Sequence, residues 1–244
     1  MLGLQYAEMP PCNTSNGQIG GFGITIPPFV KAELNNWIGY IQCKPGDSNH
    51  TAAKDGGSGY QHESGGGGPC NWVNILKTGN LLNEMAFVGD TKDTPRVVNA
   101  TNYLVMHWAD PNFSPGWKGA PNATANNHAM FSTMKGLVSL DIHELDGIDW
   151  QSDFEEVLLA QQNDDGSWPL CKWDDDKPIL STEWALLTLQ KAAPKPPTPP
   201  PPVPRVPALS QRGMVIMAAL FAALLAWTVR KRAFARKKVG TENR

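Results

Sequence analysis

The spacing of apolar side chains predicts helices through most of residues 29–193. Apolar residues recur at intervals of three and four, the spacing that brings side chains onto one face of a helix. No stretch shows the strict alternation of apolar and polar residues that is typical of a strand. The sequence therefore predicts an all-α fold. The expected helices cover residues 29–42, 72–88, 95–108, 128–140, 152–162 and 179–191.

Residues that favour helix starts support several of these elements. Ser152 precedes the acidic Asp153, and acidic side chains are stabilised in a first helical turn by the helix dipole. Pro95 fits a first turn because its missing N–H has no partner to lose there. The sequence Ser-Thr-Glu from Ser181 is a second possible start, which would shorten the last helix.

A single long apolar run occupies residues 213–229, seventeen residues without a charge. This length is at the short end of what crosses a bilayer as a helix, and a buried core helix is the alternative. Arg230, Lys231 and Arg232 follow directly, and positive charge beside a span stays in the cytoplasm. The sequence predicts a single-pass membrane protein with a cytoplasmic C-terminus anchored by this basic cluster and with residues 1–212 outside.

Before the span lies a proline-rich linker at residues 194–207, in which nine of the fourteen residues are proline. Such a stretch forms neither helix nor sheet and adopts extended polyproline II. It is expected to hold the front domain away from the membrane. Docking to a proline-reading module is the alternative use.

The net charge of −2 averages two unlike parts of the 244-residue chain. Residues 205–244 hold nine Lys and Arg and one Glu, so the tail carries about +8 and the front about −10. Nucleic acid needs a basic face for its phosphates, so an acidic front domain argues against DNA or RNA as a partner.

The region before and through the span, residues 206–238, resembles the IPTL-CTERM sorting signal of Gram-negative bacteria, a relative of the PEP-CTERM signal. The resemblance is carried by Pro207, Leu209, Ser210 and Gly213, followed by the span and the basic cluster. Arg212 departs from the pattern, which usually has Trp there. The resemblance implies export, an exosortase-type membrane protease as partner, and release of the front domain to the cell surface or exterior if the span is removed.

The N-terminus lacks both a basic region and a long apolar region, so no signal peptide is evident. An exported domain needs an entry signal. We therefore expect residues 1–28 to be a lead-in and the chain to be the C-terminal part of a longer protein.

A weak repeat links two parts of the front domain. Ile38 and Gln42 are followed by a Gly-rich turn that closes on Tyr60, and Leu158 and Gln162 are followed by a similar turn that closes on Trp168. A Gln side chain can donate to carbonyls at a helix end, and Gly permits positive φ. This arrangement is expected to fix one helical hairpin against the next.

The second copy, Leu158, Gln162, Gly166 and Trp168, resembles the core of the QW motif of squalene/hopene cyclases. Residues 29–193 are similar to the terpenoid cyclase/protein prenyltransferase superfamily. The resemblance implies an α/α toroid, in which helical hairpins are arranged in two layers around an axis. Six helices make three hairpins, so the resemblance implies an incomplete ring.

Candidate chemistry is sparse. Asp174, Asp175 and Asp176 are the residues most comparable to the catalytic acids of such cyclases, and we interpret them as a solvated or calcium-binding loop in preference to a catalytic acid. Neither the cysteines nor the histidines have the spacing of a zinc site, so no metal or cofactor is expected. The histidines, expected to be solvated or capping groups, are His50, His62, His107, His128 and His143.

The four cysteines are Cys12, Cys43, Cys70 and Cys171. An even number of cysteines in an exported domain indicates disulfides. Cys43 and Cys70, which flank the Gly-rich loop, form the preferred pair.

Together these features predict an exported, surface-displayed bacterial protein with a non-catalytic scaffold or binding domain. Its ligand is not identified by the sequence. The alternative is a terpene cyclase-like or prenyltransferase-like enzyme, with its catalytic residues upstream or at Asp174, Asp175 and Asp176.

Overall fold

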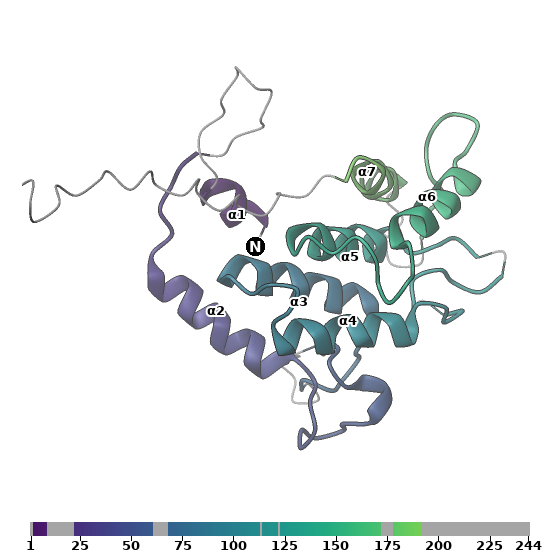
Figure 1. Ribbon diagram of the computed structural model, residues 1–244. Coiled ribbons are helices and arrows are strands. Elements are labelled where there is room, and N and C mark those ends of the chain that lie inside the picture. The colour runs from purple at the N-terminus through teal and green to yellow at the C-terminus, as the bar shows by residue number, and fades with distance from the viewer. Residues whose placement is uncertain are drawn as a thin grey trace, which may run out of the picture. The chain divides into compact units, whose positions relative to one another are not determined.

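The computed structural model describes residues 2–8, 22–60, 68–112, 114–121, 123–171 and 178–191, and these confirm an all-α fold (Figure 1). Within this part of the chain the only β interactions are isolated bridges, and no strand forms. The helices are α1 (Leu2–Glu8), α2 (Pro28–Ile41), the short 3-10 helix η2 (Ala52–Lys54), α3 (Ile75–Val88), α4 (Pro95–His107), α5 (Asn127–Ser139), α6 (Trp150–Gln161) and α7 (Pro178–Leu189).

Side-chain caps explain where two helices begin. The expected start of α3 at residue 72 is wrong, because the Asn74 side chain accepts a hydrogen bond from the backbone N–H of Lys77 at 3.0 Å and so caps a helix that starts at Ile75. The start of α6 also differs from the expectation. Asp149 accepts from the backbone N–H of Ser152 at 3.0 Å, so α6 begins two residues before Ser152.

The two ends of the described chain differ from the expectation as well. The seven-residue helix α1 was not expected, and it is held near α2 by an ion pair between Glu8 and Lys31 at 2.7 Å. At the other end, α7 is not shortened. It begins at Pro178, a residue suited to a first turn, and Ser181 lies inside it.

The helices pack around α3, α5 and α7. α3, α5 and α7 form one row, with α5 between the other two, while α2 and α4 pack on α3 and α6 packs on α7 (Figure 1). The tightest contact is between α3 and α5. A Cβ atom on Gly79 would lie 2.5 Å from the backbone nitrogen of Thr133, and one on Gly136 would lie 2.6 Å from the Gly79 oxygen. Glycine at both positions lets the two backbones approach.

Aromatic side chains join α4, α6 and the loop before α5. The ring of Phe154 lies 4.7 Å from that of Trp117 in an edge-to-face arrangement and 5.2 Å from that of Trp108. The indole N–H of Trp108 donates to the carboxylate of Asp153 at 2.6 Å. This cluster fixes the hairpin of α6 and α7 against the preceding helices.

All the described residues belong to the first of two compact units, Met1–Pro197. Several expectations lie outside the described residues: Asp174, Asp175 and Asp176, the linker, the sorting motif, the span and the basic cluster. Among the helices that are described, none combines the length and the apolar character needed to cross a bilayer.

Candidate functional site

The first glutamine corner, residues 38–60, joins the end of α2 to the start of α4. Gln42 directly follows α2, and its side-chain nitrogen donates to the backbone oxygens of Gly56 at 2.9 Å and Arg96 at 2.8 Å. Gly56 has a φ of +80°, which a glycine adopts without strain. Gln42 is only 7% exposed, and its hydrogen bond to Gly56 is buried whereas that to Arg96 is partly buried. This one side chain therefore connects the loop after α2 to the start of α4.

The second glutamine corner, residues 158–168, brings together Leu158, Gln162, Gly166 and Trp168. The Gln162 side chain donates to the Gly166 oxygen at 3.1 Å, and Gly166 has a φ of +85°. The Trp168 ring is 1% exposed, and its N–H donates to the Leu158 oxygen at 2.8 Å. Gln162 is exposed, so Trp168 provides most of the buried contact in this corner.

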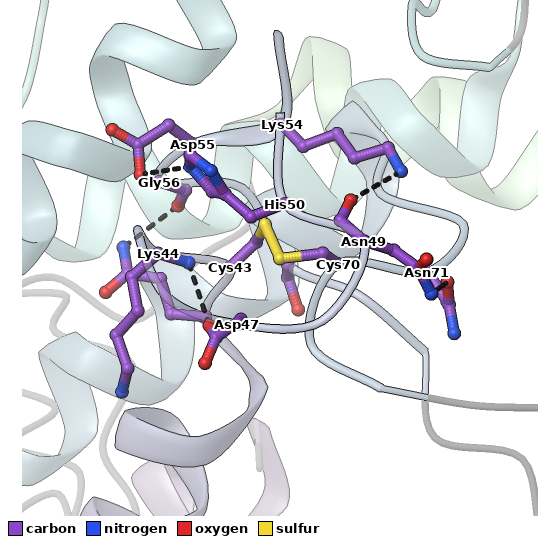
Figure 2. The surroundings of a disulfide bond; sticks show 12 residues. Cys43, Lys44, Asp47, Asn49, His50, Lys54, Asp55, Gly56, Cys70 and Asn71 are labelled. Carbon is purple, nitrogen blue, oxygen red and sulfur yellow. Dashed lines mark hydrogen bonds and ion pairs between the residues drawn. A yellow bond between two sulfur atoms is a disulfide. The ribbon is translucent and has the colours of Figure 1, made fainter. Parts of the chain in front are cut away.

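A disulfide joins Cys43 and Cys70, the pair that the sequence favours, with 4.8 Å between their Cα atoms (Figure 2). Both residues are fully buried. Because Cys43 directly follows Gln42, the bond connects the first corner to the segment that leads into α3.

Hydrogen bonds between polar groups hold the loop around the disulfide in place (Figure 2). The Lys54 ammonium donates to the Asn49 oxygen at 3.0 Å, and the Asn49 amide donates to the Asn71 side chain at 3.1 Å. At the other side of the loop, the Lys44 backbone N–H donates to Asp47 at 3.0 Å. Few apolar side chains are buried here, so hydrogen bonds and the disulfide hold the loop.

Beside this loop lie Tyr60, Trp72 and Lys77, which we call the aromatic platform. The sequence identified Tyr60 only as the residue that closes the first turn and did not predict that these three residues come together. The side chain of Trp72 is 76% exposed and that of Tyr60 is 51% exposed. The Lys77 ammonium donates to the Trp72 oxygen and lies 5.3 Å from the centre of the Tyr60 ring. Burial lowers the pKa of Lys77 to about 8. A tryptophan two residues after a disulfide cysteine was the available signal.

The histidines have local polar contacts. The sequence predicts solvated or capping histidines, and His107, at the end of α4, is not solvated. Its side chain is buried, with Nδ1 2.6 Å from the Asp110 carboxylate and Nε2 2.6 Å from the Ala53 oxygen. Its ring also lies 4.5 Å from that of Tyr103, and burial raises the pKa of the Tyr103 hydroxyl, with the Asp110 charge adding to the shift. His107 therefore connects α4 to η2.

The other described histidines lie near the surface or against a neighbouring ring. His50 approaches Asp55 at 3.4 Å, His143 approaches Asp141 at 3.1 Å, and His128 stacks on Trp184 with 4.2 Å between ring centres. In the described ranges, no group of three or more His, Cys, Asp or Glu residues is arranged to hold a metal ion.

An open pocket of about 400 Å³ lies between α4 and the loop after α5. Its acidic side chains outnumber its basic ones: Asp93, Asp141, Glu144 and Asp146 surround it, with Lys92 at one side. A cationic group would be favoured there.

No protein-family model, curated protein or solved structure matches this chain.

Proposed function

We propose that the chain is an exported, surface-displayed bacterial protein whose front domain is a non-catalytic scaffold or binding domain, sorted by the membrane signal at its C-terminus. The observation that carries this proposal is the buried disulfide between Cys43 and Cys70. Structural disulfides persist in oxidising compartments and are rare in the cytosol. The disulfide and the C-terminal signal therefore point to the same side of the membrane.

The packing of the helices supports the toroid as the form of this domain. Two hairpins, α2–α3 and α6–α7, are packed pairs, α3, α5 and α7 lie in one row, and Gln42 bonds the loop after α2 to the start of α4. The first and last helices of these hairpins expose apolar side chains. On α2 these are Phe29, Trp37 and Tyr40, and on α7 they are Ile179 and Leu186.

The polar groups around the first corner support a structural use over a catalytic one. Gln42 and His107 each make two short hydrogen bonds to fixed partners, which leaves them suited to holding helices together. A catalytic group instead needs to face a substrate, with a pKa suited to proton transfer. The described corners are therefore best explained as supports for a binding surface.

Two measurements on the full chain test this proposal. In intact cells, a protease added outside should cut the front domain and leave a C-terminal tag intact; a protected front domain would overturn export.

Purified protein should not turn over squalene or polyprenyl diphosphates. Turnover that is lost when Asp174, Asp175 and Asp176 are changed to Asn would establish the enzyme instead.

A further inference from the structure

The aromatic platform exposes two large rings, whereas four of the seven tryptophans that the structure describes are buried. Trp117, Trp150 and Trp168 are among the largest fully buried side chains, whereas Trp72 is 76% exposed. Exposed aromatic rings of this kind, held in fixed positions, are typical of recognition surfaces because they offer a large contact area with little conformational freedom to lose.

The backbone at Trp72 is fixed on both sides. Its φ is +59°, an uncommon conformation for a bulky residue that persists only where the surroundings enforce it. Cys70 on one side is held by the disulfide, and Val73 on the other is buried in the core. The Trp72 oxygen accepts from Lys77, which adds a third restraint. The ring is therefore presented from a rigid base.

Tyr60 is held beside Trp72 through the backbone. The N–H of Tyr60 donates to the Asn71 oxygen at 2.9 Å, so Tyr60 pairs with the residue that precedes Trp72. The two chain segments approach closely here, since a Cβ on Gly59 would lie 2.0 Å from the Pro69 oxygen. The two rings thus come from segments that are joined by hydrogen bonds and by the nearby disulfide.

Lys77 gives the platform a local positive charge on a front domain whose net charge is about −10, so it can hold a single carboxylate but does not form the basic face that nucleic acid needs. Its ammonium lies over the Tyr60 ring and donates to a backbone oxygen, and no ion pair among the described residues involves it. An ammonium has three donors, so Lys77 retains donors for an added carboxylate. The side-chain amides of Asn49 and Asn71 lie at the edge of the same loop (Figure 2).

We propose that Tyr60, Trp72 and Lys77 bind an acidic polysaccharide, with one sugar ring stacked on the aromatic side chains and its carboxylate on the Lys77 ammonium. A pyranose ring has an apolar C–H face that can stack on an aromatic ring. Its hydroxyls can form hydrogen bonds with side-chain amides. The proposal rests on the proposed function, because a displayed binding domain meets polysaccharides outside the cell.

Two other partners fit the platform less well. A membrane surface needs aliphatic or aromatic side chains that insert together, whereas the loop beside the platform presents Asp47, Asn49 and Lys54. A protein partner needs a larger continuous apolar patch than two rings. The small area and the single charge favour a sugar ring.

The test is affinity electrophoresis of the purified full chain in gels that contain polygalacturonate or its methyl ester. These polymers share the same sugar rings, but the ester lacks the carboxylate charge. We expect the protein to be retarded more strongly by the acid than by the ester. Because the purified chain is used, failure here would leave export, tested in cells, unaffected.

Variants then assign binding to the platform. Trp72→Ala, Tyr60→Ala and Lys77→Met should each weaken retardation by polygalacturonate about tenfold, the size typical of a residue central to an interface. Lys77→Met should not weaken binding to the ester. Trp37→Ala is the aromatic control, since Trp37 is a partly exposed ring that lies 5.7 Å from Tyr40 on α2.

Two further controls address non-specific charge. Lys135 lies 4.7 Å from the Phe131 ring, a similar lysine–aromatic pair elsewhere, so Lys135→Met should leave retardation unchanged. Replacing Arg230, Lys231 and Arg232 by Gln should leave a retardation that still depends on Trp72.

The proposal is overturned if the wild-type protein is not retarded by polygalacturonate, or if Trp72→Ala is retarded as strongly as wild type. It is also overturned if the platform variants instead lose binding to vesicles of anionic lipid while polysaccharide binding persists.

Discussion

The two glutamine corners share one backbone design and differ in what holds it. In both, a Gln directly after a helix donates to the oxygen of a glycine with positive φ: Gln42 to Gly56 and Gln162 to Gly166. In the first corner the glutamine is buried and the closing aromatic, Tyr60, is exposed. In the second, the glutamine is exposed and the closing aromatic, Trp168, is buried.

The disulfide explains why the glutamine is the buried residue in the first corner and the aromatic residue is the buried one in the second. It lies beside Gln42 and holds the long loop of the first corner, so that corner does not depend on a buried ring. The second corner has a much shorter loop to close, since Gly166 comes four positions after Gln162, and it packs Trp168 beneath the turn instead. The same glutamine-to-glycine hydrogen bond can thus recur in loops of different length, with the closing aromatic residue buried in one and exposed in the other.

The largest expected difference is between the two closing aromatic residues. Trp168→Ala should lower the free energy of unfolding by about 3–5 kcal/mol, because it removes a fully buried ring and its hydrogen bond to Leu158. Tyr60→Ala should cost less than about 1 kcal/mol, since that ring is half exposed and contacts Lys77. Urea unfolding followed by circular dichroism measures both. Equal losses would contradict the comparison.

Removing the disulfide should have the next largest effect. A variant with Cys43→Ala and Cys70→Ala should lose about 2–4 kcal/mol of stability, because the bond closes a loop across a sequence separation of 27 residues. Reductant should destabilise the wild-type protein by a similar amount and leave the double variant unchanged. If reductant destabilises both proteins equally, another cysteine is responsible.

The glutamines should show a smaller difference in the opposite order. Gln42→Ala leaves the buried Gly56 oxygen and the partly buried Arg96 oxygen without this donor and should cost about 1–3 kcal/mol. Gln162→Ala should change stability by no more than about 0.5 kcal/mol, because that side chain is exposed. Thermal unfolding of the two variants in the same buffer tests this order of stability losses. A larger loss for Gln162→Ala than for Gln42→Ala would contradict it.

Much of the helical fold could be predicted because apolar spacing is a local property of the sequence. The starts of α3 and α6 were misjudged because Asn74 and Asp149 cap them through side chains, and the apolar Trp72 extends the helical spacing past the cap. The helix α1 has seven residues, too few for a periodic pattern to appear.

The candidate site was harder to predict from the sequence than the helices were. The corners could be recognised because glutamine, glycine and aromatic residues recur in the same order. The platform could not, because Tyr60 and Trp72 belong to separate segments that meet through the Tyr60–Asn71 hydrogen bond and the disulfide. Whether a surface ring is held rigidly depends on such non-local contacts, which the order of residues alone does not reveal.

The most direct test of an exported, disulfide-held domain is the redox state of Cys43 and Cys70 in living cells. Thiols would be trapped by alkylation at the moment of lysis, and the two cysteines would be examined by mass spectrometry after digestion. We expect the membrane-associated protein to contain a peptide pair linked through Cys43 and Cys70. Full alkylation of both cysteines in that protein would contradict it, since it would show that the domain remains in a reducing compartment.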